Sequence, residues 1–304
     1  MIDCAVIIVA YRSADDLPGL LRSLPDAAGP LSWHAVVVDN YGLDDLESVL
    51  ADQERVTLIR SGGNLGYSGA LNLGRGHTPP ARFTAFLNPD LVLEPGALVA
   101  LVDACTAPGV AAAVPRVLDE AGVLRPSLRR EPTLSRALGE ALLGDLLPRR
   151  GARTSEMVRD PHRYTTGGSV DWATGAALLV RTGVLGEVGD WDAARFFLYS
   201  EETDYFRRIR AAGYEIRFAP DAVVRHRGAG SGTSSQLEAL MALNKLRYYR
   251  KWHGPVPSAA FFVVSVVHNL LRAGRPGARQ SLKALFFRSA RAALPGGEPK
   301  NPSI

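Results

Sequence analysis

Apolar runs rich in β-branched residues alternate with helical patterns along the first 105 residues. Each run has four or five residues and is followed by a segment with apolar residues at helical spacing. Repeated strand–helix units of this kind form a parallel sheet with helices on both faces. The expected strands are 5–9, 35–38, 56–59 and 83–87, and the helices that follow them are 15–24, 43–50, 66–73 and 95–105.

The residues that follow these strands are polar or glycine-rich. In open α/β sheets, ligands bind outside the carboxyl ends of the strands. We therefore expect a binding site formed by Tyr11–Ser13, Asp39–Asn40, Gly62–Gly66 and Asn88–Asp90.

The second half of the chain is less regular. After an apolar run at 110–117, the stretch 120–168 is rich in Arg, Pro and Gly, and a helix is expected near 134–146. The other elements expected in the body are a strand at 177–180, a helix from Ser200 to about Ala212, and strands at 214–218 and 222–224.

Charge is divided unevenly along the chain. The 304 residues carry a formal net charge of +4, but residues 1–238 carry a net −6 and residues 239–304 a net +10. A protein that binds nucleic acid through its whole surface does not have an acidic body. We therefore expect a body at 1–232 that does not bind nucleic acid, and a basic helical extension at 233–304 with a partner of its own.

The composition is that of a globular protein, with 46% hydrophobic and 22% charged residues. Cys4 and Cys105 lie far apart in apolar runs, which predicts reduced core thiols rather than a disulfide or metal framework. The chain starts without a basic leader, and no apolar run reaches the ~18 residues of a membrane-spanning helix. We expect a cytoplasmic protein.

Three strand ends carry groups that suit a nucleotide and a metal. Asp90 can hold a divalent cation that neutralises a diphosphate, although Asn-Pro-Asp taken alone is better explained as a turn. Asp39 can hydrogen-bond a nucleotide, although taken alone it is better explained as a helix cap. Gly62–Gly66 can present backbone N–H groups to an anion, but it matches neither a Walker motif nor Gly-x-Gly-x-x-Gly.

Acidic residues crowd the first turn of the helix after Ser200. Glu201, Glu202 and Asp204 there complement the helix dipole. Successive helix residues point about 100° apart, so Glu201 and Glu202 cannot both face one substrate. One of them can act as a general base, whereas the i, i+4 spacing of Asp204 and Arg208 favours a structural ion pair.

His226 ends the last expected strand of the body. A lone histidine is usually structural, and His226 becomes a candidate metal ligand only if its strand end lies near Asp90. The other five histidines show no ligand spacing.

An ordered set of motifs runs from residue 4 to residue 231. The motifs are Val9-Ala10-Tyr11, Val38-Asp39-Asn40, Asn64-Leu65-Gly66-Tyr67 with Asn72, Leu87-Asn88-Pro89-Asp90, Trp172-Ala173-Thr174-Gly175-Ala176, Phe197 to Asp204, and His226 with Gly228 and Ser231. Each is weak alone, but the ordered set is specific. It resembles the inverting GT-A glycosyltransferases of glycosyltransferase family 2, and among them the bacterial rhamnosyltransferases that extend lipid-linked glycans.

The resemblance implies a GT-A fold, which is an α/β fold with a Rossmann-like, mixed but mainly parallel sheet flanked by helices. Here a C-terminal helical extension follows it. In that fold, residues 1–118 form the nucleotide-binding half and 119–232 the acceptor and catalytic half.

The resemblance also implies roles for the matching residues. Asp90 would bind Mg²⁺ or Mn²⁺, with His226 as a further ligand. Glu202 stands where the family usually has the Asp of a Glu-Asp pair and is the expected catalytic base, with Glu201 and Asp204 as alternatives. The residues implied to line the nucleotide-sugar site are Ala10, Tyr11, Asp39, Asn64, Gly66, Asn88, Asp90, Trp172, Gly175 and Ala176.

Two positions depart from the family pattern. Glu202 has one methylene more than the usual Asp, and a misplacement of about 1 Å can cost on the order of 10²-fold in rate. Tyr41-Gly42-Leu43 replaces a Gly-Ser-Thr turn, which bears on base recognition. Neither change removes a chemical function.

The implied reaction is a metal-dependent single displacement with inversion, in which Glu202 deprotonates an acceptor hydroxyl. The expected donor is dTDP-rhamnose, because Pro126–Arg130 resembles the same stretch of rhamnosyltransferases, and the expected acceptor is a lipid-linked glycan of the cell envelope. The alternatives are another dTDP- or UDP-linked sugar (a hexose, an N-acetylhexosamine or a deoxysugar) and a small-molecule or natural-product acceptor.

Two other protein classes share parts of the pattern. A nucleotidyltransferase has a similar core, but it has a glycine-rich basic loop after the first strand, unlike Tyr11-Arg12-Ser13. A non-catalytic, membrane-associated subunit of a glycan-assembly complex is disfavoured by the complete set of acids.

The basic extension is expected to touch the inner face of the cell membrane through 240–295. Residues 259–271 are apolar with three polar interruptions, and Lys283, Arg288 and Arg291 flank the apolar stretch 284–287. Interfacial helices on an anionic leaflet show this pattern. The alternatives are that these helices pack on the body or form a homodimer interface.

Overall fold

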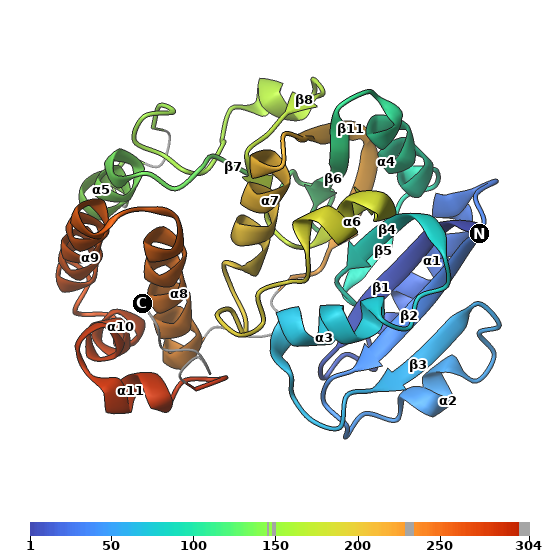
Figure 1. The fold of residues 1–304 in the computed structure, drawn as a ribbon, viewed down its shortest axis with the longest axis horizontal. Coiled ribbons are helices and arrows are strands. Elements are labelled where there is room, and N and C mark those ends of the chain that lie inside the picture. Colours follow the sequence, from blue (N-terminus) through green and yellow to red (C-terminus); the bar gives the residue numbers. More distant parts are fainter. Residues whose placement is uncertain (145, 148–149, 229–233, 298–304) are drawn as a thin grey trace.

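A nine-stranded mixed sheet forms the centre of the computed structural model, which describes residues 1–144, 146–147, 150–228 and 234–297 (Figure 1). From one edge to the other, its strands are β3 (Val56–Arg60), β2 (Trp33–Asp39), β1 (Ile2–Ala10), β4 (Ala81–Leu87), β10 (Ala177–Arg181), β6 (Val110–Leu118), β11 (Glu215–His226) and β5 (Leu91–Leu93), and β8 (Gly168–Ser169) pairs with β11.

The sheet is mixed but mainly parallel, as predicted. β1 is parallel to β2 and β4, and β6 is parallel to β11. β10 runs antiparallel between β4 and β6, while β5 and β8 are antiparallel to β11. The segments expected as two strands at 214–218 and 222–224 form the single strand β11, whose register with β6 shifts between Ala219 and Val223.

Apolar residues of β1 face both sides of the sheet, because successive side chains of a strand alternate. Val6 and Ile8 belong to the core under α1 (Leu17–Ala28) and α4 (Ala97–Thr106). Ile7 and Val9 belong to the opposite core, under α3 (Gly66–Arg75), α6 (Thr182–Val188) and α7 (Glu201–Ala211). A strand buried on both faces explains the continuous apolar run at the start of the sequence.

The remaining small elements complete the body. The short helix α2 is Leu46–Leu50 and the 3₁₀ helix is Pro161–Tyr164. β7 (Leu128–Arg129) and β9 (Trp172–Ala173) form a separate two-stranded sheet. Cys4 and Cys105 are buried and unpaired, which confirms the prediction of core thiols.

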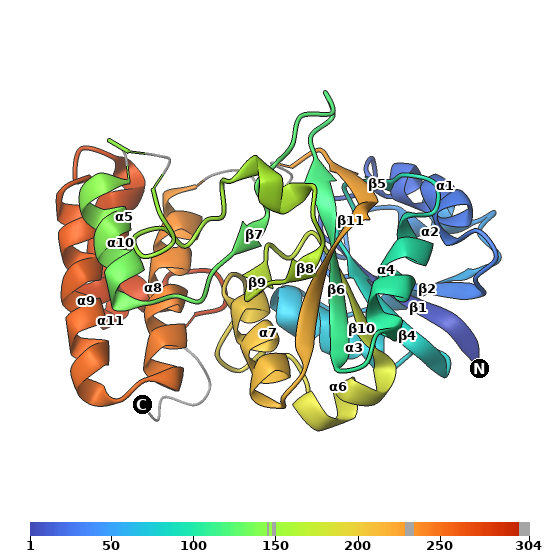
Figure 2. The same cartoon turned by 90° about the horizontal axis from the view of Figure 1, so that it is seen from above.

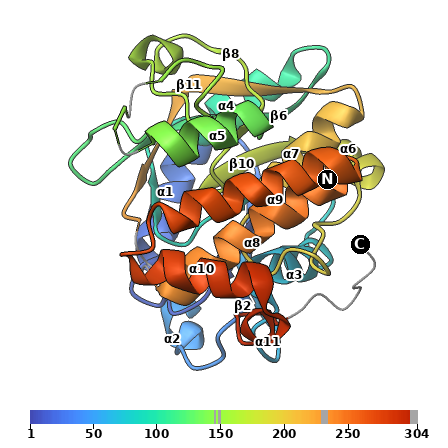
Figure 3. The ribbon, with the colours of Figure 1, turned by 90° about the vertical axis from the view of Figure 1, so that its left-hand side faces the viewer.

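A helical bundle lies beside the sheet (Figures 1 and 3). It contains α5 (Leu134–Leu143), α8 (Ser235–Trp252), α9 (Pro255–Leu270), α10 (Pro276–Phe286) and α11 (Arg288–Ala292). Because α5 comes from the body, the basic extension does not stand apart from it. No helix in the described part of the chain is long and apolar enough to cross a membrane.

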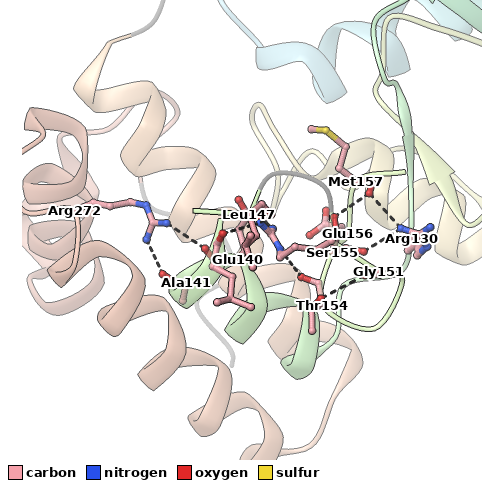
Figure 4. A network of polar contacts seen from close by, with 12 residues as sticks. Arg130, Glu140, Ala141, Leu147, Gly151, Thr154, Ser155, Glu156, Met157 and Arg272 are labelled. Carbon is pink, nitrogen blue, oxygen red and sulfur yellow. Dashed lines mark hydrogen bonds and ion pairs between the residues drawn. The ribbon is translucent and has the colours of Figure 1, made fainter. Parts of the chain in front are cut away.

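Polar contacts tie the bundle to the segment 120–168 (Figure 4). Arg272, which follows α9, donates to Ala141 O at 3.0 Å and to Glu140 O at 3.2 Å. Within the segment itself, Arg150 pairs with the Glu140 carboxylate, and Arg130 donates to Ser155 O at 3.2 Å.

A second set of contacts joins the bundle to α7. The Glu131 carboxylate accepts hydrogen bonds from Arg207 and Arg210 of α7 and from the Tyr248 hydroxyl of α8. Glu131 thus bridges α7 and α8, which are neighbours in Figure 2. The helix that begins at Glu201 therefore packs between the sheet and the extension.

Candidate active site

The end of β2 organises a turn that the sequence assigned to nucleotide contact. Asp39 Oδ1 accepts hydrogen bonds from the N–H groups of Tyr41, at 3.1 Å, and Gly42, at 2.7 Å. Its Oδ2 takes no part in these two bonds. Asp39 thus caps its own turn. The alternative expectation that it caps the following helix is wrong, because α2 begins later and Asp45 is its N-cap.

Asn40, which the sequence placed in the expected site without a role of its own, holds the turn at 64–66 in place. Its Oδ1 accepts from Leu65 N at 2.9 Å, and its Nδ2 donates to Asn64 Oδ1 at 3.2 Å. Asn64 Oδ1 also accepts from Gly66 N at 3.0 Å. The two predicted segments therefore meet at one edge, and the position of Asn40 beside Asp39 was the available signal.

Aromatic side chains gather beside these turns. Tyr11 is 41% exposed, and its ring meets that of Tyr41 edge to face, with centroids 5.0 Å apart. The Arg12 guanidinium lies 4.9 Å from the centre of the Tyr41 ring. Exposed aromatic faces with a cation nearby can stack on a planar base.

The end of β4 meets the start of β10 because these strands are antiparallel neighbours. Asn88 N donates to Ala176 O at 2.9 Å. This backbone bond between the two strand ends brings the Asn88–Asp90 segment against the Trp172–Ala176 segment. The Tyr67 hydroxyl joins them, because it donates to Asn88 Oδ1 at 3.1 Å and lies 3.5 Å from Gly175 O.

Trp172, at the start of the Trp172–Ala176 segment, has a structural role. Its side chain is buried, and its Nε1 donates to Arg130 O at 2.9 Å. The indole therefore ties β9 to the backbone that follows β7. Gly175, one of the predicted lining residues, lies beside Glu202, because a Cβ added there would be 3.8 Å from Glu202 Cβ.

Asp90 and His226 lie side by side. The sequence made His226 a candidate metal ligand only if its strand end lay near Asp90, and this condition is met. The register of β11 and β5 pairs His226 with Leu91, and His226 Nε2 is 3.1 Å from Asp90 Oδ1. Asp90 Oδ2 accepts from Gly228 N at 3.2 Å. Burial opposes ionisation of Asp90, but the hydrogen bond and charge of His226 outweigh it and lower the pKa of Asp90. Ser231, the last residue of this motif, lies outside the described residues.

This pair fits a divalent cation bound together with phosphates. A carboxylate oxygen and an imidazole nitrogen are suitable ligands for Mn²⁺, and Mg²⁺ usually takes one or two carboxylates and fills its remaining positions with substrate phosphates and water. Within the described ranges, no group of three or more His, Cys, Asp or Glu residues could hold a metal by itself. The donor diphosphate would have to complete the coordination.

Glu201 and Glu202 are held at the first two positions of α7. Among the described residues, neither Oε2 atom has a hydrogen-bond partner, and both atoms are buried. Burial raises the pKa of Glu201 well above its usual value, and the neighbouring Glu202 raises it further. Burial also raises the pKa of Glu202, against the lowering effect of its own backbone N–H and of the Arg129 guanidinium.

Asp204 is bonded on all sides. Its side chain is fully buried, and Oδ2 accepts from Arg208 Nε at 2.9 Å, so the predicted i, i+4 ion pair is confirmed. Oδ1 accepts from Trp252 Nε1 at 2.9 Å and pairs with Lys251 Nζ at 2.8 Å. These contacts place Asp204 as a link between α7 and the end of α8.

Comparison with known sequences gives one family and several relatives. The profile described as "Glycosyl transferase family 2" matches residues 5–159. The N-acetylglucosaminyl-diphospho-decaprenol L-rhamnosyltransferase of Mycobacterium tuberculosis is 32% identical over 256 residues, which cover 80% of this chain and 82% of the relative. The low-salt glycan biosynthesis hexosyltransferase Agl10 of Haloferax volcanii is 27% identical over 218 residues, covering 70% of this chain and 64% of the relative.

Solved structures share the fold. GalNAc-T7 with UDP, GalNAc and Mn²⁺ has a TM-score of 0.63 at 14% identity, and the alignment covers 94% of this chain but only 56% of GalNAc-T7. The mannosyltransferase PcManGT of Pyrobaculum calidifontis, in complex with GDP-Man and Mn²⁺, has a TM-score of 0.56 at 17% identity and covers 97% and 79% of the two chains. These likenesses confirm the predicted GT-A fold.

Proposed function

The chain belongs to glycosyltransferase family 2, and we propose that it transfers L-rhamnose from dTDP-rhamnose to a hydroxyl of a lipid-linked glycan, with inversion at the anomeric carbon. The observation that carries this proposal is the half-buried Glu202 side chain beside Gly175, whose buried Oε2 no described residue hydrogen-bonds. The rhamnosyltransferase name of the Mycobacterium tuberculosis relative supports the choice of sugar and of a lipid-linked acceptor.

The chemistry needs one base and one stabilised leaving group. Glu202 takes the proton of the acceptor hydroxyl, whose oxygen then forms a bond to the anomeric carbon as the bond from that carbon to the diphosphate breaks. The raised pKa of Glu202 makes its carboxylate a stronger base than an exposed glutamate. A divalent cation held by Asp90 and His226 would neutralise the negative charge that develops on the departing nucleoside diphosphate.

Glu202 is the base in this proposal because its neighbours are less available. Glu201 is only 5% exposed, and its pKa is raised well above the usual value, so its carboxyl stays protonated more readily. The oxygens of Asp204 are bonded to Arg208, Trp252 and Lys251. We assign proton removal to Glu202 and structural roles to the other two acids.

The donor is tested by transfer to a polyprenyl-diphospho-N-acetylglucosamine. We expect dTDP-rhamnose to give a kcat/KM at least about tenfold above that of UDP-linked hexoses or N-acetylhexosamines, because sugar pockets discriminate by shape and hydrogen bonding. Mass spectrometry of the lipid product gives the rates. Preference for a UDP-linked sugar would reject rhamnose as the substrate while leaving the chain a glycosyltransferase.

The pKa of Glu202 provides a test of its role as base. Burial raises this pKa most strongly. Of the nearby charged groups, the Arg129 guanidinium lowers it and the Glu156 carboxylate raises it. A base acts only when deprotonated, so kcat rises with pH through the pKa of Glu202. We expect Arg129→Met to move the acid limb of the kcat profile to higher pH and Glu156→Gln to move it to lower pH. Shifts in the same direction, or none, would argue against Glu202 as the titrating base.

The extension carries the proposed contact with the membrane. Exposed apolar side chains lie on α9, on α10 and in the turns that follow them, and Lys and Arg lie in the turn after α9, on α10 and after it. No acid occurs between Glu238 and Glu298. An apolar and cationic surface matches the edge of an anionic leaflet. The exposed apolar residues are Val256, Val263, Leu270, Leu271, Phe286 and Phe287.

Vesicle sedimentation of the full chain tests this contact. With vesicles containing phosphatidylglycerol, we expect Phe286→Asp/Phe287→Asp to weaken binding by about tenfold or more, because it removes apolar area and adds negative charge. Leu43→Asp is the matched control, since Leu43 is 79% exposed but lies on the body. Equal loss of binding in both proteins, or none in either, would refute the assignment of this surface.

A further inference from the structure

We propose that Asn244 of α8 is a positioning residue that holds the loop leading into Glu201 and Glu202, so that the C-terminal extension takes part in building the active site. The inference rests on the proposed role of Glu202 as the base. It goes beyond a membrane contact, because it gives α8 a function in the chemical step.

The loop before α7 has an unfavourable backbone conformation that something must hold. Tyr199 and Ser200 have φ values of 71° and 69°, in the left-handed region that residues with a Cβ rarely adopt. The helix begins at the next residue, Glu201. A relaxation of either residue would therefore change the direction in which Glu202 leaves the loop.

Asn244 supplies hydrogen bonds to this loop. Its side chain is completely buried, and Nδ2 donates to Leu198 O at 2.8 Å and to Tyr199 O at 3.2 Å. Arg247 Nη1 donates to Asn244 Oδ1 at 2.8 Å. Because a guanidinium can only donate, this bond orients the amide with its NH₂ group toward the two carbonyl oxygens.

The opposite side of the loop is fixed to the nucleotide-binding turn. Phe197 O accepts from Tyr67 N at 2.7 Å, and a Cβ on Gly66 would lie 2.3 Å from the same oxygen. Leu198 and Tyr199 also pack against buried residues of α8 such as Leu240 and Leu243. The loop is thus clamped between the turn at 64–66 and α8, and Asn244 makes the polar bonds on the α8 side.

Kinetics of the full chain test the role of Asn244. We expect Asn244→Ala to lower kcat by about 10- to 100-fold with KM for the donor within about threefold, because misplacing a catalytic group by about 1 Å has an effect of this size. Asn244→Asp should behave alike, since it keeps the size of the side chain and its contact with Arg247 but cannot donate to the carbonyls. Rates are measured below the melting temperature of every variant.

Asn269→Ala is the matched control. Asn269 is also buried in the extension, but its Nδ2 donates to Ser265 O of its own helix. We expect this variant to keep kcat within about twofold. The proposal is wrong if kcat falls no further in Asn244→Ala and Asn244→Asp than in Asn269→Ala. It is also wrong if the Asn244 variants change only the KM for the donor and keep kcat.

Glu202→Gln separates this inference from the proposed function. Full turnover by Glu202→Gln refutes the role of Glu202 as the base. The role of Asn244 in positioning Glu202 then fails with it. An inactive Glu202→Gln together with unimpaired Asn244 variants refutes only the role of Asn244.

Discussion

Replacing Glu202 with Gln is expected to lower kcat by about 10³-fold, within the 10²–10⁴ range of general base catalysis. The amide keeps the size of the side chain but cannot take a proton from the acceptor. The nucleotide turn and the Asp90–His226 pair are left intact, so the donor Kd should stay within about twofold. Initial rates of transfer and calorimetric titration of the nucleotide with Mn²⁺ measure the two quantities.

Glu201→Gln is the matched control for this prediction. It changes the adjacent carboxyl in the same way, and we expect a loss of at most about tenfold, because Glu201 takes no proton in the proposed reaction. Retained turnover in Glu202→Gln combined with inactivity of Glu201→Gln would move the base to Glu201.

Asp90→Asn is expected to weaken Mn²⁺-dependent binding of the nucleoside diphosphate by at least about tenfold, because even the loss of a residue that only supports a metal ligand commonly costs about 10- to 100-fold. Asn keeps an oxygen that can accept from Gly228 N but lacks the negative charge that strengthens the binding of a cation. Calorimetry with and without Mn²⁺ measures the effect, and binding in the absence of metal should change little.

Asp16→Asn is the control for the metal site. Asp16 forms an ion pair with Arg227. Burial raises the pKa of Asp16, and the nearby Asp90 carboxylate raises it further, which shows that Asp16 lies close to the proposed metal site. We expect the metal-dependent affinity of this variant to stay within about threefold. Unchanged metal-dependent affinity in Asp90→Asn, or an equal loss of it in Asp16→Asn, would contradict the assignment of Asp90 as a metal ligand.

The fold was predictable where the apolar pattern is local and continuous. The expected strand at 83–87 is β4 (Ala81–Leu87), and the expected helix at 134–146 is α5 (Leu134–Leu143). β5 has only three residues, too few for a period to be recognised. Pro220 interrupts β11 in the sequence, and the strand continues past it because the pairing with β6 shifts register there.

The site was predictable as a set of candidates but not as a geometry. Asp90 and His226 are far apart in the sequence, and only the pairing of β5 with β11 brings them together. Tyr67 was recognised within a motif, but its contact with Gly175 depends on the antiparallel placement of β10. Asn244 gave no signal, because a single polar residue within a helix does not reveal which loop it meets.

The anomeric configuration of the product tests the central claim most directly. NMR of the glycan formed by the wild-type enzyme from dTDP-rhamnose gives this configuration without any substitution in the protein. The proposed single displacement, with Glu202 as base, predicts a product whose anomeric configuration is opposite to that of the donor. A product with the configuration of the donor would contradict it.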